Sequence, residues 1–84
     1  MAIKGLTEGR IVHYVLEDGN FPGEHRPAIV VKVWDRENGT CNLRVFTDGP
    51  NDFPDNLDGI LHCASVLHDD DHEPGTWHFI EYQD

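Results

Sequence analysis

The chain has 84 residues, enough for one small domain with a single core and too few for a multidomain enzyme. It holds 16 acidic and 6 basic residues, a formal net charge of −10. Because nucleic-acid binding needs clustered Lys and Arg, this charge argues against direct binding to nucleic acid or to an anionic membrane. No apolar run approaches the roughly 20 residues that cross a bilayer, and the first residues do not resemble a secretory signal, so we expect a cytoplasmic protein.

The charge is unevenly divided along the chain. Residues 1–44 contain six basic and six acidic side chains, whereas residues 45–84 contain ten acidic and no basic ones. Such an excess repels nucleic acid but accelerates the encounter with a basic partner. Two interpretations remain open: these carboxylates share one surface and form a partner-binding patch, or they are a plain solvated acidic face. The predicted patch consists of Asp48, Asp52, Asp55, Asp58, Asp69, Asp70, Asp71 and Glu73.

The first half of the chain predicts two strands separated by a long loop. Residues 10–16 are rich in β-branched and aromatic residues and alternate between two faces, which predicts a strand. Residues 17–27 are dense in turn formers and end at His25-Arg26-Pro27, which predicts a loop. Residues 28–34 are short, β-branched and almost continuously apolar, which is typical of a central strand covered on both faces.

Three further strands are predicted in the rest of the chain. The Asn38-Gly39 pair favours a hairpin, so residues 40–47 are expected to pair antiparallel with the preceding strand. Residues 48–59 predict an ordered loop that packs through its own apolar side chains. Alternation returns in residues 60–68, and again in residues 77–82 after an acidic turn.

Five short strands with turns at this spacing predict an all-β fold with residues 1–84 as a single domain. We expect a small five-stranded antiparallel meander that closes into an SH3-like barrel, and a flat sheet with an N-terminal helix is the structural alternative. The predicted core consists of Val12, Val15, Ile29, Val31, Val33, Leu43, Val45, Leu61, Val66, Phe79 and one or both tryptophans.

Signals for metal binding are weak in the sequence. Cys41 and Cys63 lie inside predicted strands and match no C-x-x-C motif, so they are expected to be buried free thiols. His68 and His72 flank a run of carboxylates and are the candidate metal ligands, because imidazole and carboxylate groups bind zinc, nickel or manganese. A closed site needs a rigid frame, whereas this stretch has the composition of an exposed turn. We therefore expect no metal and no other cofactor.

Signals for catalysis are also weak. His25, His62 and His78 are conceivable bases, but none has a recognisable nucleophile motif near it. Gly-rich phosphate loops and the H-E-x-x-H pattern do not occur in the sequence. The sequence therefore predicts no catalytic residues and a protein that is not an enzyme.

A second candidate site lies where the predicted strands end. His25 and Arg26 precede the second strand and Thr47 and Asn51 follow the third, so an antiparallel hairpin places them at the same end of the sheet. In the structural interpretation, Arg26 pairs in bidentate fashion with Asp48 or Asp52 and holds the loop. In the functional interpretation, this end holds a small ligand such as a nucleotide, with the guanidinium on a phosphate and an aromatic ring on a base. The ligand-binding residues would be His25, Arg26, Thr47, Asn51 and Trp77.

Three segments of the chain carry a family resemblance. They are His25–Trp34 (HRPAIVVKVW), Asn42–Asp52 (NLRVFTDGPND) and Gly75–His78 (GTWH). In combination they resemble a family of small proteins from tailed phages and prophages, over most of residues 12–80. The resemblance implies a phage-encoded product that acts inside a bacterial host cell, and it carries over no residue roles.

Three functions follow as hypotheses. The first is a non-enzymatic binding protein whose acidic patch covers the basic, nucleic-acid-binding surface of a host protein, as in defence inhibition or host takeover. The second is a ligand-binding or sequestering module that uses the strand-end site, as a monomer or as a homo-oligomer with pockets between subunits. The third is a structural or assembly role in the virion.

Overall fold

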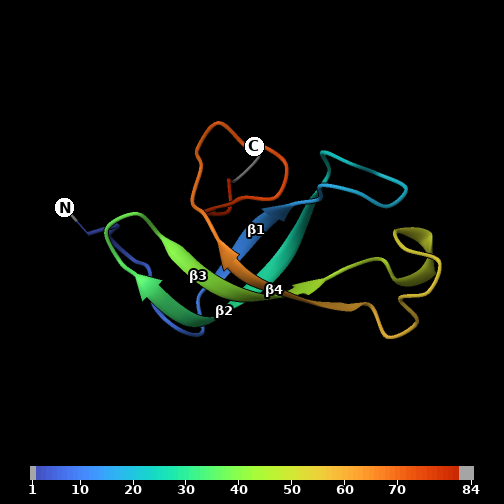
Figure 1. Ribbon diagram of the computed structural model, residues 1–84, viewed down its shortest axis with the longest axis horizontal. Coiled ribbons are helices and arrows are strands. Elements are labelled where there is room, and N and C mark those ends of the chain that lie inside the picture. Colours follow the sequence, from blue (N-terminus) through green and yellow to red (C-terminus); the bar gives the residue numbers. More distant parts are fainter. Residues whose placement is uncertain (1, 82–84) are drawn as a thin grey trace.

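The computed structural model describes residues 2–81, which form one antiparallel sheet of five strands (Figure 1). The sheet order is β4-β3-β2-β1-β5, so each of the first four strands pairs with its neighbour in sequence and β5 returns beside β1. The prediction of an all-β, five-stranded antiparallel fold is confirmed. No helix in residues 2–81 has the length and hydropathy to span a membrane. The elements are β1 (Ile11–Val15), β2 (His25–Asp35), β3 (Thr40–Phe46), the 3₁₀ turn η1 (Gly49–Asn51), β4 (Ile60–Val66) and β5 (Trp77–His78).

Strand β2 begins three residues earlier than the sequence predicts. Val15 pairs with His25 and His13 with Pro27, so the predicted loop end belongs to the ladder with β1. Pairing of β2 with β3 starts only at Ala28, so Pro27 costs no hydrogen bond on that side. The last strand is shorter than predicted, with Trp77 and His78 alone in the ladder, and the end of the predicted strand, residue 82, lies outside the described residues.

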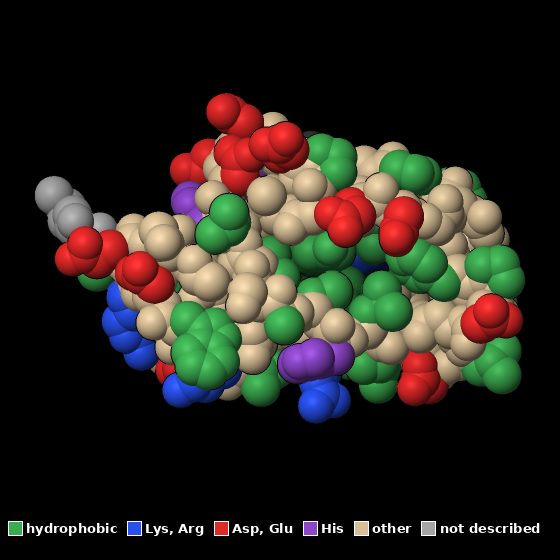
Figure 2. All heavy atoms as spheres, in the orientation of Figure 1, with side chains coloured by type: hydrophobic (Ala, Val, Ile, Leu, Met, Phe, Trp, Pro, Cys, Tyr) green, Lys and Arg blue, Asp and Glu red, His purple; other side chains and the backbone are tan. Residues whose placement is uncertain are grey.

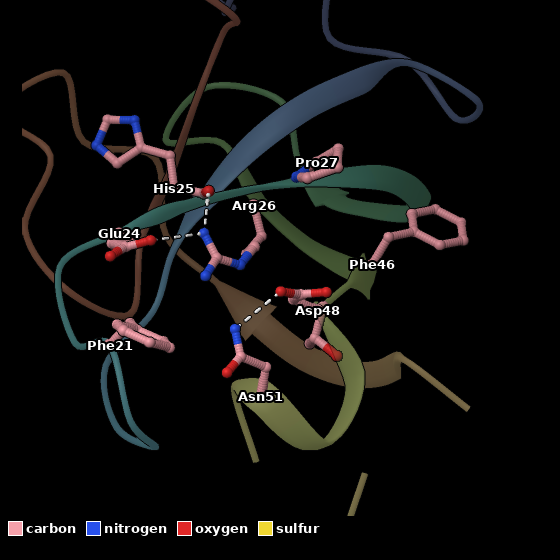
Figure 3. A pocket seen from close by; sticks show the side chains of 9 residues that line it. Phe21, Glu24, His25, Arg26, Pro27, Phe46, Asp48 and Asn51 are labelled. Carbon is pink, nitrogen blue, oxygen red and sulfur yellow. Dashed lines mark hydrogen bonds and ion pairs between the residues drawn. The ribbon is translucent and has the colours of Figure 1, made fainter. Parts of the chain in front are cut away.

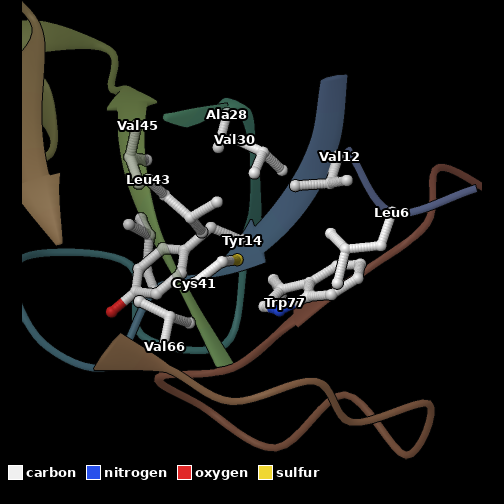
Figure 4. Close-up of a cluster of buried hydrophobic side chains, with 11 residues drawn as sticks. Leu6, Val12, Tyr14, Ala28, Val30, Cys41, Leu43, Val45, Val66 and Trp77 are labelled. Atoms are coloured by element: carbon white, nitrogen blue, oxygen red, sulfur yellow. The ribbon is translucent and has the colours of Figure 1, made fainter. Parts of the chain in front are cut away.

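The core lies on one face of the sheet, as period-two alternation requires (Figure 4). Trp77 is its largest member and is fully buried, and its indole N–H donates to the backbone oxygen of Gly39 at 2.8 Å. This bond joins β5 to the turn between β2 and β3. The cluster comprises Leu6, Val12, Tyr14, Leu16, Ala28, Val30, Cys41, Leu43, Val45, Val66 and Trp77.

The prediction that residues 28–34 are covered on both faces is wrong. Val31 is 44% exposed and Trp34 is 59% exposed. The register between β2 and β3 shifts between Val30 and Lys32, so Val30 and Val33 both reach the core while Val31 points outward. This β-bulge lies within a continuous run of apolar residues, where no alternation of polar and apolar residues indicates its position.

The two edges of the sheet come together without a ladder between β4 and β5 in residues 2–81. The N–H of Trp77 donates to the carbonyl of Leu67 at 3.0 Å, and the N–H of Asp69 donates to the carbonyl of Trp77 at 2.9 Å. These bonds accompany an isolated parallel bridge between His68 and Trp77. The segment that follows β4 is therefore tied to β5, and the acidic loop that comes next lies close to β1.

We expect Gly39→Ala to lower the free energy of unfolding by about 3 kcal/mol, as measured by urea denaturation. Gly39 has a φ of +83°, and a Cβ there would lie 2.6 Å from the Cβ of His68 and 2.7 Å from a methyl carbon of Ile3. Gly9→Ala is the matched control, since Gly9 has a φ of +90° with nothing within 4 Å. An equal loss for both variants would show that packing around Gly39 contributes nothing.

Candidate metal centre

Four side chains from different parts of the chain converge on the sheet face opposite the core. They are His13 of β1, His25 of β2, His78 of β5 and Glu81, which follows β5. One nitrogen or oxygen atom from each lies within 4.8 Å of the others. We call these four residues the His–Glu cluster.

The strand register places the three histidines together. His13 lies directly opposite His78 in the β1–β5 ladder. His25 lies opposite Val15, two residues along β1 from His13, so its side chain shares a face with that of His13. The neighbouring residues Val12, Tyr14 and Trp77 point to the core, which leaves the histidines on the other face.

The carboxylate of Glu81 lies between the imidazole rings. Its Oε1 atom is 2.7 Å from Nδ1 of His13, 3.2 Å from Nδ1 of His25 and 3.1 Å from Nε2 of His78. Its Oε2 atom is 2.9 Å from Nε2 of His78 and 3.3 Å from Nε2 of His72. One carboxylate therefore faces a ring nitrogen from each of four histidines.

His72 covers the cluster from the loop between β4 and β5. Its ring stacks on that of His78 with centroids 3.7 Å apart and planes 22° apart. The backbone N–H of His72 donates to the carbonyl of Asp69, and His72 has a φ of +62°, which is unusual for a residue with a side chain. The loop accepts this conformation, and the resulting turn directs the ring onto His78.

The surroundings shift the pKa of two groups in this cluster, His78 and Glu81. Burial lowers the pKa of His78, whose side chain is 2% exposed, and so favours its neutral ring. For Glu81, burial alone would raise the pKa, but hydrogen bonds from His13, His78 and His25 outweigh it and lower the pKa to about 2. A neutral imidazole and an ionised carboxylate are the forms that bind metal ions.

The chemical types of the four donor atoms suit a transition-metal ion. Three imidazole nitrogens and one carboxylate oxygen suit Zn²⁺ and related ions, whereas Ca²⁺ and Mg²⁺ prefer oxygen ligands. In a tetrahedral site with metal–ligand distances of about 2.0–2.1 Å, neighbouring ligand atoms lie about 3.4 Å apart. The three distances from Oε1 of Glu81 to the imidazole nitrogens, 2.7–3.2 Å, are hydrogen-bond lengths, and all four donor atoms lie within 4.8 Å of one another.

The sequence predicts no metal site, and neither of its weak candidate ligands belongs to the His–Glu cluster. His72 lies beside the cluster, but His68 packs on Trp77, with ring centroids 4.6 Å apart, and is not a member. His13 and Glu81 were not among the predicted site residues. The alternation of residues 10–16 puts His13 opposite the core, but its partners become visible only when the β1–β5 register is known.

The predicted strand-end site exists as an open pocket of about 580 Å³ (Figure 3). His25, Arg26, Thr47 and Asn51 line it as predicted, whereas Trp77 is buried in the core and the prediction that it belongs to this site is wrong. Further walls come from Phe21, Glu24, Phe46 and Asp48.

Arg26 has the structural partner that the sequence predicts. Its Nε and Nη2 atoms donate to the two carboxylate oxygens of Asp52, each at 2.7 Å. Asp52 is fully buried and also accepts the backbone N–H of Asp48 at 2.7 Å. Hydrogen bonds from Arg26 lower the pKa of Asp52 in spite of its burial. Asp52 is therefore inside the fold, and its prediction as a member of a surface patch is wrong.

The other predicted patch residues divide between two loops. Asp48, Asp55 and Asp58 lie around η1 and in the loop to β4, whereas Asp69–Asp71 and Glu73 lie in the loop after β4. Figure 1 shows these loops in different parts of the molecule, one beyond the end of β3 and one over β1. On the face shown in Figure 2, acidic side chains gather over the loop after β4 and others stand apart from them.

The two cysteines are free thiols, Cys41 buried in the core and Cys63 half-buried. Neither belongs to the His–Glu cluster. Burial raises the pKa of Cys41 to about 11 and is also the main reason for the raised pKa of Cys63, so both favour the protonated thiol.

Comparison of this chain with protein-family models, with curated proteins and with solved structures finds no match. The interpretation of the site therefore depends on its own geometry.

Proposed function

We propose that this protein binds one divalent transition-metal ion, with the properties of zinc, through His13, His25, His78 and Glu81. The observation that carries the proposal is the convergence of three imidazole nitrogens and one carboxylate oxygen within 4.8 Å of one another. Three strands of one hydrogen-bonded sheet position the histidines, so the frame exists without the metal. The carboxylate comes from the segment after β5, so the ion would also fix that segment to the sheet.

The proposal has a direct binding test. Isothermal titration of the EDTA-treated, dialysed full chain with Zn²⁺ is expected to give one site per chain. His13→Asn and Glu81→Gln each remove a ligand and are expected to weaken the affinity by at least about 100-fold, since loss of an outer-shell partner alone costs 10–100-fold. Co²⁺ substitution, followed by visible absorption, reports whether the coordination is tetrahedral.

His62→Asn is the control for this experiment. His62 is exposed on β4 and lies outside the cluster, so its loss is expected to leave zinc affinity within about twofold. Circular dichroism of each variant checks that the sheet is intact. Absence of a one-to-one binding event, or an equal effect of His62→Asn, would refute the proposal.

For the finer architecture, we propose an SH3-like barrel. The strand order β4-β3-β2-β1-β5 and the bonds between Trp77 and residues 67–69 support it, because they bring the two edges of the meander toward one another. An experimental structure in which β5 loses its contacts to residues 67–69 would count against it.

A further inference from the structure

The pocket at the strand ends has chemistry of its own, separate from metal binding. Phe21 and Phe46 stand on its walls and are 36% and 40% exposed. Glu24 and Asp48 add two carboxylates, and Figure 3 shows them on either side of the Arg26 guanidinium. An open concavity with apolar walls and a few charged groups is a typical ligand site.

The guanidinium of Arg26 is already hydrogen-bonded to groups within the protein. In addition to its two bonds to Asp52, its Nη1 atom donates to Glu24 at 3.1 Å and to the carbonyl of His25 at 3.0 Å. The carboxylates of Glu24 and Asp52 pair with this guanidinium and Asp48 adds a third carboxylate to the pocket region, so its charge is negative. A phosphate would have to compete with Asp52 for Arg26 and would meet two further carboxylates, so the nucleotide hypothesis does not fit this geometry.

We propose that this pocket binds an arginine side chain from a basic segment of a partner protein. The carboxylates of Glu24 and Asp48 are exposed to solvent. Oε1 of Glu24 accepts from Arg26 and Oδ2 of Asp48 accepts from Asn51, which leaves the second oxygen of each as an acceptor for an incoming guanidinium. The exposed faces of Phe21 and Phe46 suit both the methylene stem and the planar guanidinium, which stacks on aromatic rings. The pocket thus matches each part of an arginine side chain.

The charge of the whole molecule favours an arginine carried by a basic polypeptide over the free amino acid. The net charge is −10, and residues 45–84 contain no Lys or Arg. A segment with several positive charges gains from this field before and after contact, whereas a single zwitterion gains little. The inference gives a definite contact point to the basic partner that the sequence predicts, and it does not depend on metal binding.

The test is the binding of a fluorescent, end-blocked hexapeptide, Gly-Arg-Ser-Gly-Arg-Ser, followed by fluorescence anisotropy at low salt in EDTA. We expect the double variant Glu24→Gln with Asp48→Asn to weaken binding about tenfold or more. The control double variant Glu37→Gln with Asp55→Asn makes the same charge change at exposed positions outside the pocket and is expected to change binding less than about twofold. A peptide with citrulline in place of arginine is expected to lose about tenfold, because it keeps the shape and loses the charge.

Each alternative outcome overturns the proposal. Equal losses in the two double variants would show unspecific attraction to an acidic protein. Equal binding of the citrulline peptide would show that charge recognition is absent. Equal affinity for arginine amide and for the hexapeptide would identify a free small cation as the ligand, and binding of AMP in preference to the peptide would identify an anion site.

Discussion

Replacing Asp52 with asparagine is expected to lower the free energy of unfolding by about 3–5 kcal/mol, a large share of the roughly 5–15 kcal/mol typical of a domain. The carboxylate is fully buried and its two oxygens accept three hydrogen bonds, two from Arg26 and one from the backbone of Asp48. An amide of the same size turns one acceptor into a donor that faces another donor. The Arg26 charge, mostly buried with its side chain 16% exposed, then loses its buried counter-ion and keeps only the exposed carboxylate of Glu24.

Urea denaturation at neutral pH measures this loss, and Asp55→Asn, a change of the same kind at an exposed position, is the control. The pH dependence gives a second check. Because the folded-state pKa of Asp52 is lowered, its stabilisation is complete above the unfolded pKa of about 3.9 and is lost as the pH falls through the folded value. The difference between wild type and Asp52→Asn should therefore shrink below about pH 4. A loss under about 1 kcal/mol at neutral pH would contradict the structural role assigned to this pair.

Zinc at about 100 times its dissociation constant is expected to stabilise the protein by about 2.7 kcal/mol at neutral pH. For a domain of this size that gain corresponds to a rise in melting temperature of roughly 10–20 °C. The gain is expected to disappear near pH 5, because protons compete with zinc for the imidazole nitrogens of the ligand histidines. Differential scanning fluorimetry across this range measures it.

Two controls separate specific binding from general ion effects. Mg²⁺ at the same concentration is expected to give no gain, since it prefers oxygen ligands. Glu81→Gln keeps the three histidines but loses the ionised oxygen, so its gain at the same zinc concentration should be much smaller than that of wild type. A zinc gain that persists at pH 5, or that Mg²⁺ reproduces, would contradict a histidine-based centre.

The sequence predicted the features that depend on strand order and missed those that depend on register. The Arg26–Asp52 pair and four lining residues of the pocket follow from a hairpin between β2 and β3, which the Asn38-Gly39 turn indicates. The His–Glu cluster requires the β1–β5 ladder, in which only two residue pairs fix the alignment. Period-two patterns identify faces but do not specify which residues on neighbouring strands stand opposite one another.

The same limit explains the errors in the core. Ile29 and Val31 belong to the same apolar run as Val30, but Val30 is buried in the core whereas Ile29 is half-buried and Val31 is exposed. The shift beyond Val30 brings Val33 to the core as well. Trp77 is buried because the β1–β5 ladder and the loop after β4 together hold it in the core, whereas Trp34 is exposed. No local sequence pattern distinguishes these two tryptophans.

Consecutive residues of β2 serve the two sites, since the His25 ring joins the His–Glu cluster while Arg26 extends toward the pocket (Figure 3). A shift of this strand end on metal binding would therefore also move Glu24, which directly precedes His25 and lines the pocket. Thermodynamic reciprocity then sets a quantitative condition: the factor by which zinc alters peptide affinity must equal the factor by which the peptide alters zinc affinity.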